Sequence, residues 1–153
     1  AEPMKEEVVN VGDLIAGIIA THEMFVSDSG LTLEYDAQPD VMVVGDADMI
    51  RQATANLISN AVRYTPRGGR IRVVWKRTGT GAVLTVADTG IGIPAEELDK
   101  IFERFYKVDT FTQGTGLGLS ICKSIAEQMG AQIGVDSAVG EGSCFRVEMP
   151  IAE

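Results

Sequence analysis

Asp88 stands where an apolar run gives way to a glycine-rich turn, and its side chain is the clearest candidate for chemistry in the chain. From Val83 to Pro94 the sequence reads Val-Leu-Thr-Val-Ala-Asp-Thr-Gly-Ile-Gly-Ile-Pro. An ionised carboxylate only accepts hydrogen bonds, and the exocyclic amino group of adenine only donates them. Asp88 is therefore a candidate for binding an adenine base. The structural alternative is that its side chain caps the turn through the backbone.

Two glycines follow this aspartate, and glycine lets a backbone take positive φ and approach a ligand closely. They are Gly90 and Gly92, and Gly90-x-Gly92-x-x-Ala95 also fits the dinucleotide-binding fingerprint, with an acid, Asp109, suitably placed beyond it. A carboxylate ahead of the glycines would repel a pyrophosphate lying on that loop. The turn therefore favours adenine binding, and a dinucleotide-dependent oxidoreductase remains an alternative.

Polar side chains recur every three or four residues in a second stretch, which has helical periodicity. Gln52, Asn56, Asn60 and Arg63 would share one helix face. Asparagine is a mediocre helix former, so two of them one turn apart need a reason, and hydrogen bonds to neighbouring backbone would supply one. The sharper hypothesis is a magnesium site, since Mg²⁺ takes one or two oxygen ligands from protein and the rest from phosphates and water. Asn60 would be the ligand, with Asn56 beside it and Arg63 facing the phosphates.

A second glycine-rich segment, from Gly114 to Ser120, runs into a predicted helix that ends at Gly130. It reads Gly-Thr-Gly-Leu-Gly-Leu-Ser. The exposed N–H groups and the dipole at such a junction favour an anion. The segment is not a P-loop, because Gly-x-x-x-x-Gly-Lys-Ser/Thr occurs nowhere in the sequence. The polar, unpatterned residues from Val108 to Gln113 before it are predicted to form a flexible loop.

The elements that position these residues follow from hydrophobic periodicity. The strand-like runs predict a mixed sheet, and the two earliest of them are expected to form a hairpin around Gln38-Pro39-Asp40. Helices are predicted over Val11 to Asp28, Asp46 to Tyr64, Ala95 to Ile101 and Leu119 to Met129, and strands over Leu31 to Tyr35, Val41 to Val44, Arg70 to Lys76, Val83 to Ala87, Ala131 to Val135 and Ser143 to Met149.

The composition is that of an ordinary soluble domain, with 153 residues, 45% hydrophobic and 23% charged. A formal charge of −9 argues against nucleic acid or an anionic membrane as the main partner. The longest uninterrupted apolar run, Leu14 to Ala20, is too short to cross a bilayer. The two cysteines, Cys122 and Cys144, lack metal-ligand spacing, so buried, reduced thiols in the cytoplasm are expected.

The motifs in their order closely resemble the catalytic, ATP-binding domain of sensor histidine kinases. The resemblance covers nearly the whole chain from Val11, and it rests on Asn56-Leu-Ile-Ser-Asn60-Ala, Asp88-Thr-Gly-Ile-Gly-Ile-Pro94, Ile101-Phe-Glu-Arg-Phe105, Gly114-Thr-Gly-Leu-Gly-Leu119 and Gly140-Glu-Gly-Ser143. It implies the Bergerat (GHKL) fold, an α/β sandwich in which a mixed, mostly antiparallel sheet packs against about three helices. ATP would lie between the second helix and a mobile lid.

The resemblance also implies a role for each matching residue. Asn60 would bind Mg²⁺, Asp88 would bind the adenine amino group, and Phe102 and Phe105 would anchor the lid. The full set implied to contact Mg-ATP is Asn56, Asn60, Arg63, Tyr64, Asp88, Gly90, Gly92, Ile93, Lys107, Thr115, Gly116, Leu117, Gly118 and Leu119.

The implied activity is transfer of the γ-phosphate of ATP to a protein histidine in two-component signalling. In the resembling chaperone, gyrase and mismatch-repair ATPases, a glutamate one helical turn before the Mg²⁺-binding asparagine activates water. Here that position is Asn56, which cannot act as a base. Phosphoryl transfer is therefore favoured over hydrolysis, with a GHKL-type ATPase or a nucleotide-binding regulatory module without phosphotransfer as alternatives.

The phospho-acceptor is expected to lie outside this chain. The only histidine is His22, and after His22-Glu23 the residues Met24 to Ser27 depart from the phospho-acceptor box, so a packed or edge histidine is predicted. Residues 1–10 are interpreted as a linker remnant from an upstream dimerisation and phospho-acceptor hairpin, and 11–153 as the catalytic domain. The expected partners are that acceptor domain and a response-regulator receiver domain, in the cytoplasm, with no nucleic acid and no direct membrane contact, although the parent protein can be anchored in the inner membrane.

Overall fold

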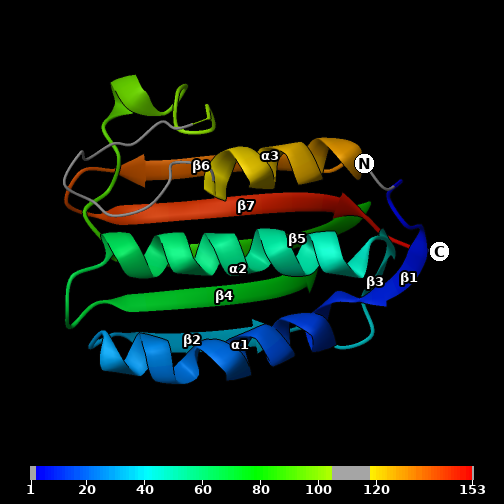
Figure 1. Ribbon diagram of the computed structural model, residues 1–153, viewed down its shortest axis with the longest axis horizontal. Helices are drawn as coiled ribbons and strands as arrows, with labels where there is room; N and C mark the ends of the chain where they lie inside the picture. The colour runs from blue at the N-terminus through cyan, green and yellow to red at the C-terminus, as the bar shows by residue number, and fades with distance from the viewer. Residues whose placement is uncertain (1–2, 105–117, 153) are drawn as a thin grey trace.

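A five-stranded sheet with helices on one face organises the chain (Figure 1). The computed structural model describes residues 3–104 and 118–152. In sheet order the strands are β2 (Thr32–Ala37), β4 (Arg70–Arg77), β5 (Gly81–Asp88), β7 (Gly142–Pro150) and β6 (Gln132–Ala138). Only the β2–β4 pair among them is parallel. The predicted mixed, mostly antiparallel sheet is confirmed.

Three α-helices of the described residues form the second layer. They are α1 (Val11–Asp28), α2 (Ala47–Tyr64) and α3 (Gly118–Gln128). α1 packs on β2, α2 on β4 and β5, and α3 on β6, so each helix covers its own part of one face. No helix in the described part of the chain is both long and apolar enough to span a bilayer.

The predicted hairpin between the two earliest strand-like runs is wrong. β2 pairs with β4, whereas β3 (Met42–Gly45) pairs antiparallel with β1 (Glu7–Asn10) in a separate two-stranded ribbon. The cause lies at the connection, where Asp40 takes a positive φ of 62° and turns the chain out of the main sheet. Gln38 still donates its N–H to the Trp75 carbonyl (2.8 Å), so the β2–β4 ladder closes before the turn. That residues 1–10 continue an upstream hairpin stays a prediction.

The helix predicted from Ala95 to Ile101 is also wrong, since only a 3₁₀ turn, η1 (Ala95–Glu97), forms there. The following residues continue as turns, and the Lys100 N–H donates to the Glu97 carbonyl three residues earlier (2.9 Å). Ile93 and Ile101 are both buried, and successive tight turns carry the chain between them. Burial of these two anchors therefore prevails over the local helical propensity.

The alternation of side chains along the strands decides where Asp88 points. Val86 is buried against the helices, and residues two apart on a strand share a face, so Asp88 lies on the helix side at the end of β5. Its cross-strand partners are Ile71 on β4 and Ser143 on β7. A carboxylate is thus the last side chain of a row that is otherwise apolar core.

Candidate functional site

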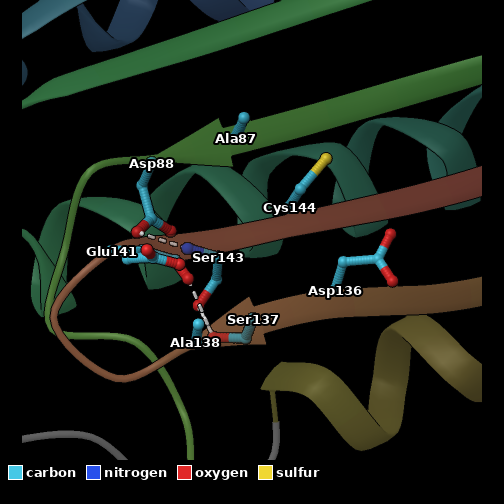
Figure 2. Close-up of a pocket in the computed structure, with 9 residues that line it drawn as sticks. Ala87, Asp88, Asp136, Ser137, Ala138, Glu141, Ser143 and Cys144 are labelled. Atoms are coloured by element: carbon cyan, nitrogen blue, oxygen red, sulfur yellow. Dashed lines mark hydrogen bonds between the residues drawn. The ribbon is translucent and has the colours of Figure 1, made fainter.

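The Asp88 carboxylate caps the glycine turn with one of its two oxygens. Oδ1 accepts hydrogen bonds from the N–H groups of Gly90 (2.9 Å) and Ser143 (3.2 Å). Figure 2 shows the second of these bonds joining the ends of β5 and β7. Within residues 3–104 and 118–152, no hydrogen bond reaches Oδ2. The capping and the adenine-binding interpretations are therefore compatible, because one oxygen caps the turn and the other can accept from a ligand.

Burial raises the pKa of Asp88, and the two backbone N–H groups oppose that rise only in part. The charged form is consequently less well solvated than that of an ordinary surface aspartate. A ligand that donates a hydrogen bond to Oδ2 would supply some of the missing solvation. The electrostatics of the site therefore favour a donor group such as an amine.

The loop after Asp88 is held on both sides by backbone contacts. The Ile91 N–H donates to the carbonyl of Tyr64 at the end of α2 (3.1 Å), and the Gly140 N–H donates to the Ile91 carbonyl (2.9 Å). Gly92 has φ 76°, and a Cβ there would overlap the Ala138 carbonyl oxygen. The glycine loop thus lies directly on the β6–β7 hairpin.

A second close approach fixes the hairpin against Asp88 itself. Gly142 has φ 115°, and a Cβ there would overlap the Asp88 carbonyl oxygen. Ser143 follows immediately and supplies one of the two N–H groups that bind the carboxylate. The position of the carboxylate therefore depends on a glycine in a different strand.

The predicted polar face of α2 lies beside the start of α3. Asn56 and Asn60 are half-buried, and Arg63 is exposed. The Asn56 Nδ2 atom lies 3.5 Å from the Gly118 carbonyl oxygen at the first residue of α3, which is the long limit of a hydrogen bond. Since α2 also contacts the glycine loop through Tyr64, the same helix borders both the part of the site predicted to bind adenine and the part predicted to bind phosphates.

The amide donor set of α2 fits a hard cation that is held mainly by phosphates. No group of three or more His, Cys, Asp or Glu side chains suited to a metal occurs in the described residues. Mg²⁺ needs no such cage when phosphate oxygens and water complete its octahedron, and one amide oxygen suffices from the protein. The half-buried Asn60 meets that requirement on the same face as Arg63.

Several predicted contacts lie outside the described residues. These are Lys107, Thr115, Gly116 and Leu117, together with Phe105 and the loop from Val108 to Gln113. Gly118 and Leu119 are half-buried in the first turn of α3. Phe102 makes an edge-to-face contact with Phe145, with ring centroids 6.2 Å apart. A role for Phe102 in anchoring a lid stays a prediction.

Two serines and a glycine of the hairpin were missed as site residues by the sequence analysis. Ser143 and Gly142 belong to a motif that supported the family resemblance, but no role was given to either. Ser137, on β6, bonds to the glycine loop through the Ile93 N–H (2.8 Å). Only strand register shows that these residues meet Asp88, because they lie 49 or more positions further along the chain.

A hollow of about 400 Å³ opens on the other side of the same sheet end, with α2 behind the strands (Figure 2). Its lining includes the carboxylates of Asp136 and Glu141. Arg146 pairs with Asp136, but the remaining carboxylates of the lining, Asp88 and Glu141, would still repel phosphate groups. The hollow therefore does not suit a triphosphate, although it shares residues with the candidate site. Its lining residues are Ala87, Asp88, Asp136, Ser137, Ala138, Glu141, Gly142, Ser143 and Cys144.

The remaining sequence predictions concern His22 and the cysteines. His22 is half-buried, and its Nδ1 lies 2.9 Å from the Ile18 carbonyl oxygen, so this nitrogen carries the proton and donates. The prediction of a packed or edge histidine is confirmed. Both cysteines are free thiols; Cys122 is buried, which raises its pKa to about 12, and Cys144 is half-buried.

Comparison with known proteins agrees with this geometry. Residues 45–153 match the family of histidine kinase-, DNA gyrase B- and HSP90-like ATPases. The chain belongs to this family. Sensor-like histidine kinase SenX3 of Mycobacterium tuberculosis is 35% identical over 146 residues, which cover 93% of this chain and 36% of SenX3. The chain thus spans about a third of the length of this relative.

Solved structures of histidine kinase catalytic domains share the whole fold of this HATPase domain. The nucleotide-free catalytic domain of histidine kinase ThkA is 30% identical, with a TM-score of 0.87 and 96% of both chains covered. ThkA in complex with the response regulator protein TrrA has a TM-score of 0.83 and is 26% identical, with 97% of this chain and 42% of that chain covered. Full-length ShkA in complex with AMPPNP is 28% identical, with a TM-score of 0.87, 99% of this chain and 32% of that chain.

The two hairpin glycines give a matched test of how the site is held. Gly140 has φ 82° in open space, so Gly140→Ala should cost about 1–2 kcal/mol of unfolding free energy from the left-handed backbone alone. Gly142→Ala adds overlap with the Asp88 carbonyl and should cost more than about 3 kcal/mol. Urea unfolding of both variants measures the difference. Equal losses would contradict the close approach at Gly142.

Proposed function

We propose that this HATPase domain binds Mg-ATP and transfers the γ-phosphate to a histidine of a separate dimerisation and acceptor domain. The observation that carries the proposal is the Asp88 carboxylate, which is half-buried, turned toward the helices and bonded through one oxygen only within the described residues. Its second oxygen can accept from the adenine amino group. The comparison with ShkA bound to AMPPNP, an ATP analogue, supports the same class of ligand.

The phosphates are assigned to the polar face of α2. Asn60 would hold Mg²⁺ through its amide oxygen, and the ion when bound would neutralise charge on the β- and γ-phosphates. Arg63, one turn further along and exposed, is free to swing toward the phosphate oxygens. The first turn of α3, from Gly118, offers backbone N–H groups to an anion. These contributions are electrostatic and positional, which is what phosphoryl transfer requires of a protein.

Transfer is favoured over hydrolysis by the residue one turn before Asn60. Asn56 has an amide in that position, and an amide cannot take a proton from water at neutral pH. Its side chain lies instead against the Gly118 carbonyl. In the proposed reaction an imidazole nitrogen of the acceptor attacks the γ-phosphorus, the bond to the bridging oxygen breaks, and ADP leaves. A receiver domain would then accept the phosphate, as the ThkA complex with TrrA suggests.

The transfer step is tested by mixing this chain, ATP and Mg²⁺ with the dimerisation and acceptor domain of the same kinase. We expect phosphate on the added domain and negligible steady-state release of inorganic phosphate by the chain alone. His22→Gln should behave like the wild type, because His22 is a half-buried residue of α1 whose Nδ1 is bonded to the Ile18 carbonyl of the same helix, and the proposed acceptor lies on the other domain. Fast hydrolysis by the chain alone would point to an ATPase, and nucleotide binding with no transfer would point to a regulatory module.

Asn60→Ala should remove the magnesium-dependent part of nucleotide affinity and nothing else. Titration calorimetry with a non-hydrolysable ATP analogue should show binding to this variant that no longer strengthens when Mg²⁺ is added. Gln52→Ala, two turns earlier on the same face and exposed, is the matched control and should keep the wild-type response. A magnesium response that survives in Asn60→Ala would overturn the assignment of the ligand.

Asp88→Asn should separate the effect of the Asp88 charge on folding stability from its effect on nucleotide binding. The amide oxygen can still accept from Gly90 and Ser143, so the turn should keep its cap. The pKa of Asp88 is raised in the folded protein, so protonation of this carboxyl stabilises the folded state relative to the unfolded chain. That stabilisation is fully present below the ordinary pKa of about 4 and is lost as the pH rises through the folded pKa. The ligand-free variant should therefore match the wild type in acid and be at least as stable at pH 7.

The same variant should lose at least about tenfold in ADP affinity, since an amide that donates its N–H₂ toward the adenine amino group cannot replace a carboxylate. Urea unfolding across pH and calorimetry with ADP provide the two measurements. A variant that is less stable than the wild type at pH 7 but not at pH 4 would contradict the electrostatic argument. Unchanged ADP affinity would contradict the proposed role of Asp88.

A further inference from the structure

Residues 5–10, here called the entry segment, contain strand β1 and make two hydrogen bonds to the start of α2. The Lys5 N–H donates to Oδ2 of Asp46, the N-cap residue of α2 (3.1 Å). The Glu7 carboxylate accepts from the N–H of Ala47, the first residue of the helix (3.2 Å). The first N–H groups of a helix have no acceptor within the helix and depend on such caps. The entry segment therefore completes the N-terminal capping of α2.

The Asp46 carboxylate joins the helix to the entry segment, because its two oxygens have different partners. Oδ1 accepts from the N–H groups of Asp48 (3.0 Å) and Met49 (3.3 Å) inside α2, whereas Oδ2 accepts from Lys5. The pKa of Asp46 is lowered, and the hydrogen bond from Lys5 is the largest cause. Withdrawal of the entry segment would remove the donor to Oδ2 and the acceptor of the Ala47 N–H. The start of α2 is thus capped differently when the segment is docked and when it is released.

The entry segment is held less firmly than the strand beside it. In β1 the Val9 side chain is buried, but its neighbour Val8 is 69% exposed. Among the described residues β1 pairs only with β3, whereas β3 has a second neighbour on its other side, through the bridge from Val43 to Ile151. Segments with few buried apolar contacts open at the lowest free energy. Release of β1 therefore leaves β3 in place.

The strand β3 leads to the place where α2 begins and α3 ends. A Cβ on Gly45, the last residue of β3, would lie 2.7 Å from the terminal methyl carbon of Met129, just beyond α3. From this end of the molecule α2 runs toward the glycine loop, with α3 packed along it (Figure 1). Farther along the pair, Asn56 lies against the Gly118 carbonyl. The packing of α2 on α3 therefore connects the entry segment to the part of the site proposed to bind phosphates.

We propose that docking of the entry segment on α2 is coupled to nucleotide binding, so that the docked segment raises nucleotide affinity and bound nucleotide holds the segment in place. The inference rests on the proposed function, because it concerns the affinity of the same site, but its contacts lie at the opposite end of α2 from the glycine loop. The coupling is reciprocal, since two events that stabilise one arrangement of α2 and α3 stabilise each other. Movement of the residues before Lys5 would then change nucleotide affinity without any contact with the nucleotide.

Two substitutions release the entry segment without touching the nucleotide site. Lys5→Pro removes the backbone donor to Asp46, and Glu7→Ala removes the acceptor of the Ala47 N–H. The double variant should bind ADP about three- to tenfold more weakly, as expected when part of the loss of a helix cap reaches the site. Lys5→Ala, which keeps the N–H, and Glu6→Ala, at an exposed neighbouring position, are the matched controls and should bind ADP like the wild type. Calorimetry measures the affinities at a temperature where urea titration shows every variant to be folded.

Amide hydrogen exchange of the wild-type chain tests the reciprocal effect. Saturating Mg-ADP should slow exchange at Lys5 and Ala47. Thr78, whose N–H is bonded to the Gly81 carbonyl in the turn between β4 and β5, is the matched control and should not change, because no contact links that turn to the proposed path.

A folded double variant with wild-type ADP affinity would overturn the inference, and so would unchanged exchange at Ala47 in saturating Mg-ADP. Should the double variant fail to fold, the exchange result for the wild type decides alone. Absence of ADP binding by the wild type would refute the proposed function, and the coupling with it. Binding of ADP by the wild type without either effect would refute the coupling only.

Discussion

The structure depends on the direct contact between the glycine loop after β5 and the hairpin between β6 and β7. At Gly92 and Gly142 the two backbones lie so close that neither position has room for a side chain. This contact brings the Ser143 N–H to the Asp88 carboxylate from the far strand, while the Gly90 N–H reaches it from within the loop. A charge at the end of an apolar row is thereby kept in one orientation without a cationic partner among its hydrogen-bond donors.

That orientation has an energetic cost that connects folding to function. Burial raises the pKa of Asp88, and two N–H groups on one oxygen recover only part of the lost solvation. The ligand-free domain therefore carries a carboxylate oxygen with no hydrogen-bond partner among the described residues, where an adenine amino group is proposed to bind. α2 supplies the other half of the site, because Tyr64 contacts the loop and Asn56 contacts the start of α3. Base and phosphate recognition are joined through one rigid helix.

The sequence predicted what is local and missed what depends on register. The bounds of α1 and α2 follow from periodicity and caps, and Asp88 with its glycines follows from a short motif. The pairing of β3 with β1 depends on the positive φ at Asp40, and the short 3₁₀ turn after Pro94 depends on burial of Ile93 and Ile101, neither of which has a local signal. Ser137 and Ser143 gained a role only when strand register set them beside Asp88, because a serine near a turn has many ordinary explanations.

The central claim is that an adenine nucleotide binds on the helix side of the sheet end, between Asp88 and the polar face of α2. Backbone amide shifts of the ¹⁵N-labelled chain, followed while Mg-ADP is added, test it most directly. The account predicts saturable shifts at Gly90 and Ser143 and along α2 from Asn56 to Tyr64, with little change at Gln132 on the distant end of β6. Shifts confined to the outer hollow around Asp136 and Glu141, or no shifts at all, would contradict it.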